Sequence, residues 1–157
     1  MVLCAAIEVT GMPDEMFFDT STLVYAFDTS DPEKHEIALG LVHDILADKE
    51  KGIVSGQVLA ELYNVLTGYV SNPLSGDEAA TIISDFVDAS GWIKLDYKTA
   101  TVKRAASAST KHGIKIWDAL IAETMKENEI YTIITENEKD FKKIPGIRAV
   151  NPFRNEI

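Results

Sequence analysis

The sequence predicts an α/β domain built around a parallel β-sheet. Short apolar runs alternate along the chain with segments whose apolar residues repeat at helical spacing, which is the pattern of βαβ units. The 157 residues have the length of one domain, and 46% of them are hydrophobic, which is enough for a sizeable core. Because no repeat or linker rich in Pro, Gly or Ser divides the chain, we expect one compact unit.

Five segments are candidate strands, because each is a short apolar run bounded by polar or turn-forming residues. The helical segments between them would supply the crossovers that parallel strands require. The five candidates are residues 16–18, 53–54, 92–95, 131–134 and 147–150.

Capping patterns predict where the first two long helices begin. Residues 30–33 offer the Ser30 hydroxyl as a cap, a proline in the first turn and a Glu three residues after the Ser. This helix ends before Gly52, its expected C-terminal cap, whereas Ser55 caps the next helix, which the loop at residues 71–74 stops. Their apolar faces are Ile37, Leu41, Ile45 and Leu46 in the first helix and Val58, Leu59, Leu62, Tyr63 and Leu66 in the second.

Three further helices follow. Residues 75–78 form a second capping box. A helix over residues 99–112 ends at Gly113, and another runs from 117 to 128, where Asn128 is its C-terminal cap. The apolar face of the helix that begins at the capping box is Ala79, Ile82, Ile83, Phe86 and Val87.

The composition limits where the protein works and what it binds. No apolar run approaches the roughly 20 residues of a membrane-spanning helix. The first residues carry Glu8 and no Lys or Arg ahead of their apolar stretch, unlike a secretory signal, so we expect a cytoplasmic protein. Cys4 is the only cysteine and the three histidines lack metal-ligand spacing, so oxygen ligands must bind any metal.

A net charge of −10 argues against a broad basic surface that grips nucleic acid through many phosphates. Two explanations of the acidity stay open. Solvated Asp and Glu residues promote solubility. Alternatively, several carboxylates converge to hold divalent cations, which then supply the positive charge that a phosphate needs.

Three acids stand out by position. Asp19 ends the first strand, where an open parallel sheet presents side chains to a ligand crevice. Glu61 borders the apolar face of its helix, and Asp118 opens a nearly unbroken apolar helix. Each also has a purely structural interpretation. Asp19 or Ser21 would cap a helix over residues 22–27, and Glu61 would be a solvated surface residue. Asp118 would be stabilised by the helix dipole in the first turn of its helix.

A fourth polar cluster, residues 135–141, directly follows the fourth strand and offers several oxygen ligands, or is simply a polar turn. Taken together, these acids follow or flank successive strand ends and would meet at one edge of the sheet. Clustered carboxylates repel one another unless cations lie between them, and Mg²⁺ or Mn²⁺ prefers oxygen ligands and water. This chemistry suits phosphodiester hydrolysis.

Four segments in this order resemble the PIN-domain ribonucleases, especially the VapC-type toxins of toxin-antitoxin pairs. They are residues 18–27, Glu61 in a helix headed by Ser55, residues 117–122 and residues 135–141. The resemblance spans about residues 16–152, between an extension at 1–15 and a tail at 153–157. It implies a three-layer α/β/α domain with a five-stranded parallel sheet and Mg²⁺ or Mn²⁺ as cofactor. The site acids it implies are Asp19, Glu61 and Asp118. Asp140 is a candidate fourth acid, and Ser21, Thr135, Glu136 and Asn137 are candidate supporting residues.

Asn137 is a departure, because that family often has an acid two residues after the Thr that ends the fourth strand. Asp140 or Glu136 would supply the missing carboxylate, or only one metal ion would bind tightly. Residues 1–15 are either a disordered or mis-started tail or an added edge element.

The resemblance further implies an RNA substrate, a small antitoxin partner and a homodimer. The main hypothesis is therefore a metal-dependent endoribonuclease held in check by an antitoxin. The alternatives are a PIN nuclease that processes RNA without an antitoxin, and a binding or scaffold module with weakened catalysis. A phosphatase that uses Asp19 as nucleophile fits less well, because Ser21 stands where such enzymes commonly carry a second Asp.

Overall fold

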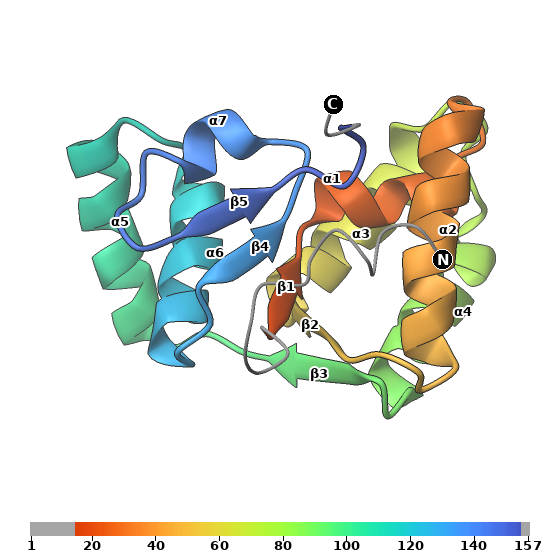
Figure 1. Cartoon of the computed structure of the whole chain (residues 1–157), viewed down its shortest axis with the longest axis horizontal. Coiled ribbons are helices and arrows are strands. Elements are labelled where there is room, and N and C mark those ends of the chain that lie inside the picture. Colours follow the sequence, from red (N-terminus) through yellow and green to blue (C-terminus); the bar gives the residue numbers. More distant parts are fainter. Residues whose placement is uncertain (1–14, 155–157) are drawn as a thin grey trace.

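A five-stranded parallel sheet forms the centre of the computed structural model, which describes residues 15–154 (Figure 1). The strand order is β3-β2-β1-β4-β5, and every neighbouring pair is parallel. All five predicted strands are therefore present, and no strand end differs from the prediction by more than one residue. The strands are β1 Met16–Phe18, β2 Gly52–Ser55, β3 Trp92–Leu95, β4 Thr132–Ile134 and β5 Arg148–Val150.

Helices cover both faces of this sheet, as the α/β/α prediction requires. Figure 1 shows α5 and α6 to one side of the strands and α2, α3 and α4 to the other. The α-helices are α1 Thr20–Leu23, α2 Pro32–Leu46, α3 Gly56–Gly68, α4 Gly76–Asp88, α5 Thr99–His112, α6 Ile116–Glu127 and α7 Glu138–Phe141, and a 3₁₀ turn, η1, covers Val24–Ala26.

β1 is the central strand and its side chains are buried on both faces. Phe17 pairs with Ile53 of β2 on one edge and with Ile133 of β4 on the other. Phe18 packs edge-on against Trp92 of β3, with ring centroids 5.3 Å apart. This burial explains why the strand is apolar throughout instead of alternating with polar residues.

Two of the predicted N-terminal helix caps are confirmed, as are the C-terminal caps Gly113 and Asn128. The Ser55 hydroxyl accepts a 3.2 Å hydrogen bond from the Val58 N–H at the start of α3. Ser75 and Glu78 form the reciprocal capping box of α4. Gly113 ends α5 with φ of 62°, the left-handed conformation that glycine adopts without strain.

The predicted ends of α2 are wrong. Asp31 is the N-cap, because its carboxylate accepts a 3.2 Å hydrogen bond from the Lys34 N–H. Ser30 instead donates through its hydroxyl to Asp28. Gly52 does not cap the helix, which ends at Leu46, but begins β2, where a Cβ atom would lie 2.6 Å from the Trp92 ring. Close packing against Trp92, not a left-handed turn, explains this glycine.

The apolar faces extend less far than their periodicity predicts. Tyr63 on α3 and Val87 on α4 are exposed, whereas Leu62 and Phe86 beside them are buried. The predicted tail begins at residue 153, but Phe153 packs against the domain. Its ring centroid lies 5.2 Å from that of Tyr25. The predicted N-terminal extension lies outside the described residues, apart from Glu15.

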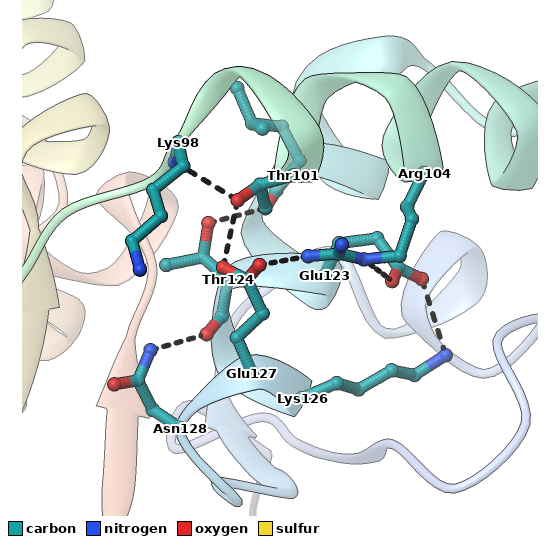
Figure 2. Close-up of polar contacts among 9 residues, drawn as sticks. Lys98, Thr101, Arg104, Glu123, Thr124, Lys126, Glu127 and Asn128 are labelled. Atoms are coloured by element: carbon teal, nitrogen blue, oxygen red, sulfur yellow. Dashed lines mark hydrogen bonds and ion pairs between the residues drawn. The ribbon is translucent and has the colours of Figure 1, made fainter.

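A polar network joins α5 to α6 (Figure 2). The buried Thr101 hydroxyl donates a 2.7 Å hydrogen bond to Glu127, and Arg104 pairs with both Glu127 and Glu123. The two helices also make the most extensive helix-helix contact in the domain. This network holds α6, whose first turn carries Asp118, against the rest of the fold. No helix within residues 15–154 is long and apolar enough to cross a membrane.

Candidate active site

The strand order reverses its direction of growth between β1 and β4. From β1 the chain adds β2 and β3 toward one edge, and from β4 it adds β5 toward the other. In open α/β sheets ligands bind at such a switch point, outside the carboxyl ends of the strands. Asp19 follows β1 and Thr135 follows β4, and the Asp19 N–H donates a 3.0 Å hydrogen bond to the Ile134 carbonyl. Both residues therefore lie at the switch point.

Asp19 is a buried carboxylate, only 6% exposed. Its Oδ2 atom accepts hydrogen bonds of 2.7 Å from the Thr135 hydroxyl and 2.8 Å from the Ser21 hydroxyl. Burial raises the pKa of Asp19, and these two hydrogen bonds oppose that rise. Asp19 occupies the N-cap position of α1, but its side chain makes no capping hydrogen bond. The capping interpretation therefore does not account for this carboxylate.

Glu61 projects from α3 toward the same region. Its Oε2 atom accepts a 3.2 Å hydrogen bond from the Thr20 hydroxyl, next to Asp19 in the chain. Its Oε1 atom accepts a 2.8 Å bond from the Gln57 amide, which also donates at 3.0 Å to the Trp117 carbonyl. Two hydrogen bonds thus orient Glu61, which rules out the interpretation of a freely solvated side chain.

Asp118 lies in the first turn of α6 and is half-buried. Burial and the negative charges of Asp19 and Asp140 raise its pKa to about 6, Lys115 partly offsets this, and Glu61 adds a smaller rise. Hydrogen bonds connect three of these acids: the Thr135 hydroxyl donates to Asp19 and accepts from the Asn137 N–H, and the Asn137 amide donates to Asp118 and Asp140. Glu61 is linked to the same region through Thr20 and Gln57.

In the polar segment after β4, some residues contact the acid cluster and others contact residues outside it. The Asn137 amide donates at 3.3 Å to both Asp118 and Asp140, so it links two of the acids. Glu136 instead forms an ion pair with Lys34 of α2, although its N–H donates to Ser21. Asp140 also pairs with Lys143 at 2.9 Å. Of the two acids considered as a replacement at position 137, Asp140 is thus the one that interacts with Asp118.

Three features of the site were missed by sequence reasoning. Thr20 and Gln57, which hold Glu61, have no distinguishing pattern around them. The residues predicted as a polar turn include a short helix, α7, whose Glu138 pairs with Lys142 at 2.9 Å. The signal for α7 was present, because Glu138 and Lys142 stand at the i,i+4 spacing of a helical ion pair.

The chemistry of the donor set suits a hard divalent cation. All four acids offer carboxylate oxygens, and their mutual repulsion would be relieved by a positive ion. As the side chains stand, the described part of the chain holds no group of three His, Cys, Asp or Glu placed to share one ion. Mg²⁺ keeps several of its waters and commonly takes only one or two carboxylates, so this arrangement fits such an ion.

The parallel sheet, the acids at its switch point and the helices on both faces define a three-layer α/β/α domain of the kind found in nucleases. The family model for the PIN domain matches residues 16–147, and the chain belongs to this family. No curated protein matches the sequence.

Solved structures of similar fold include a toxin and a toxin-antitoxin complex. VapC20 of Mycobacterium tuberculosis, described as a sarcin-ricin loop cleaving toxin, is 18% identical with a TM-score of 0.64 over 80% of this chain and 92% of that one. A toxin-antitoxin complex from Klebsiella pneumoniae is 22% identical, with a TM-score of 0.59 over 88% and 98%. VapBC2 of Rickettsia felis, bound to promoter DNA, is 22% identical, with a TM-score of 0.60 over 87% and 97%.

Proposed function

We propose that this protein is a metal-dependent endoribonuclease and the toxin of a VapBC-type toxin-antitoxin pair. The observation that carries the proposal is the chain of hydrogen bonds at the switch point of the sheet, in which Thr135 joins Asp19 to Asn137, and Asn137 joins Asp118 to Asp140. A buried carboxylate is normally paired with a cation, whereas Asp19 and Asp118 form no ion pair within residues 15–154. Such an arrangement is common where a site is built to receive positive charge.

Asp19, Glu61 and Asp118 would hold Mg²⁺ or Mn²⁺, with Asp140 as the fourth acid. A bound ion of this type supplies an activated water and stabilises the negative charge that develops on the phosphate. The remaining residues position these ligands. Thr135 and Ser21 orient Asp19, Thr20 and Gln57 orient Glu61, and Asn137 keeps Asp118 beside Asp140.

The proposed antitoxin partner rests on the similar structures, one of which is described as a toxin-antitoxin complex. We propose a homodimer and an RNA substrate because the chain belongs to the PIN family. A short reading frame beside the gene, encoding a small protein that co-purifies with this chain and suppresses cleavage, would support the toxin role. Cleavage without such a partner would favour an RNA-processing nuclease.

A second candidate function is a binding module with weakened catalysis. Asn137 favours it, because its amide occupies oxygens of Asp118 and Asp140 that an ion would otherwise use. The two functions differ in whether purified protein cuts RNA when a metal ion is supplied.

The test is cleavage of a labelled structured RNA by purified protein with Mn²⁺, with Mg²⁺ and with EDTA. Asp19→Asn and Asp118→Asn should each lower the rate by at least about 100-fold, because each removes a charged ligand. The matched control is Asp85→Asn, the same change at an exposed residue of α4, which should leave the rate unchanged. Absence of metal-dependent cleavage by the unmodified protein would favour the binding module.

A further inference from the structure

The indole of Trp117 is a large apolar group exposed beside the acid cluster. It is 58% exposed, whereas Trp92, the other tryptophan, is 1% exposed and lies in the core. Within residues 15–154 the Trp117 ring makes no aromatic or cation-π contact. Its position is thus not explained by packing within the domain.

The backbone at Trp117 is nevertheless fixed to the site. Its carbonyl accepts a hydrogen bond from the same Gln57 amide that holds Glu61, and Gln57 is itself buried. The next residue is Asp118, and consecutive Cα atoms lie about 3.8 Å apart. A nucleotide whose phosphate sits at Asp118 would therefore have its base within reach of the indole.

Lys115 adds a positive charge on the same short stretch. It is the N-cap residue of α6, three residues before Asp118. It is exposed, and in the described part of the chain it forms no ion pair. An aromatic face and a nearby free cation are the two elements that single-stranded nucleic acid binding requires.

The overall charge makes the aromatic contact more important. With a net charge of −10, the protein cannot depend on many phosphate contacts for affinity. Stacking of a base on an aromatic ring does not depend on net charge and tolerates any base. We infer that Trp117 is a stacking platform for an unpaired base next to the cleaved phosphodiester, and that Lys115 contacts the adjoining backbone. This inference rests on the proposed function and names the residues that would hold the base and the backbone beside the cleaved bond.

Tryptophan fluorescence tests the inference without requiring catalysis. A short single-stranded oligouridylate is added to the protein in EDTA, and inorganic polyphosphate serves as a polyanion without bases. The oligonucleotide should quench the emission of Trp117, whereas polyphosphate should not. Trp117→Phe should remove this quenching and keep the affinity, because Trp92 is buried and phenylalanine can still stack.

Affinity and kinetics supply the second measurement. Trp117→Ala should weaken oligonucleotide binding by between about 5-fold and about 150-fold, the range for one lost base stack, and should raise KM with little change in kcat. Tyr69→Ala removes an even more exposed aromatic ring, at the C-cap of α3, and should change neither quantity.

Three outcomes would overturn the inference: equal quenching by polyphosphate, binding unaffected by Trp117→Ala, or dissociation of a homodimer by Trp117→Ala in sedimentation with no effect on RNA binding. The last result would mean that a second copy covers the indole. Each of these results, like an unchanged KM in Trp117→Ala, would leave the proposed function intact. Base-dependent quenching without any cleavage would support the stacking role and contradict the proposed function.

Discussion

The Thr135 hydroxyl and the Asp19 carboxylate form a 2.7 Å hydrogen bond across the junction between β4 and β1. The Thr135 oxygen also accepts a 2.9 Å bond from the Asn137 N–H, so one buried hydroxyl joins the central strand to the loop that carries Asn137. This bond lowers the pKa of Asp19 against the effect of burial. Thr135 thus helps to keep Asp19 ionised.

Replacing Thr135 with Val should move the acid limb of the cleavage pH profile to higher pH. The loss of the hydrogen bond raises the pKa of Asp19 further, so that its carboxylate form is lost at a higher pH as the solution is acidified. We expect the fall in rate to be largest on the acid side of the profile. Thr135→Ser keeps the hydroxyl and should restore the original profile, whereas an unshifted profile in Thr135→Val would contradict this role.

Asp118→Asn should stabilise the protein at neutral pH. The pKa of Asp118 is raised to about 6 in the folded protein from an ordinary value near 3.8, so the folded state binds the proton more tightly. Stability therefore falls as pH rises between these two values, and the full penalty is present above the folded pKa. After allowance for solvent screening of this half-exposed group, the penalty is about 1 to 2 kcal/mol.

The measurement is urea unfolding of Asp118→Asn and of the control Asp85→Asn, each at pH 4 and pH 7.5, without divalent ions. The gain in the free energy of unfolding should appear at the higher pH and largely vanish at the lower one. A gain of equal size at both pH values would show that the charge of Asp118 is not its cause.

Asn137→Asp should strengthen metal binding and lower the stability of the metal-free protein. The change removes the amide that bridges Asp118 and Asp140 and adds a further carboxylate among them. We expect a lower Tm in EDTA and a larger rise on adding Mn²⁺ than in the unmodified protein, because ion binding stabilises the folded state by mass action. Asn64→Asp on the exposed face of α3 is the control and should show neither effect. A smaller Mn²⁺ response would contradict the expectation.

Gly91→Ala should be strongly destabilising. A Cβ atom at Gly91 would lie 1.9 Å from the carbonyl oxygen of Ile45, so the backbone of α2 or of the turn before β3 would have to move. Overpacking of this kind costs typically about 1 to 3 kcal/mol or more. Gly40→Ala, at an exposed position in α2 with open space around it, should instead stabilise by about 0.5 to 1 kcal/mol. Thermal unfolding of both variants would show the contrast, and similar Tm values would refute it.

Local signals explain what could be predicted from the sequence. The strands and the caps at Ser55 and Ser75 depend on neighbours a few residues away, so their patterns are visible in the chain. The cap of α2 was misassigned because Ser30 and Asp31 both suit the position, and the geometry of the turn decides between them. The acids at strand ends could be found because parallel strands all present their carboxyl ends to the same edge.

Interactions between distant elements could not be predicted in this way. Nothing beside Gln57 in the sequence indicates that its amide joins Glu61 to the backbone at Trp117. The ion pair that draws Glu136 toward Lys34 likewise depends on how α2 is oriented. A pattern can show that an acid is present, but its partners depend on the packing of whole helices.

The adjacency of β1 to β4 has a consequence for synthesis on the ribosome. β1 is among the first parts of the domain to be made, yet one of its two neighbours is the second-last strand. A nascent chain that ends before Thr135 has Asp19 without that partner and lacks Asn137 and Asp140 altogether. If the acids cut RNA, the nascent chain cannot cleave the RNA of its own ribosome until residues 135–140 have emerged and the acid cluster is complete.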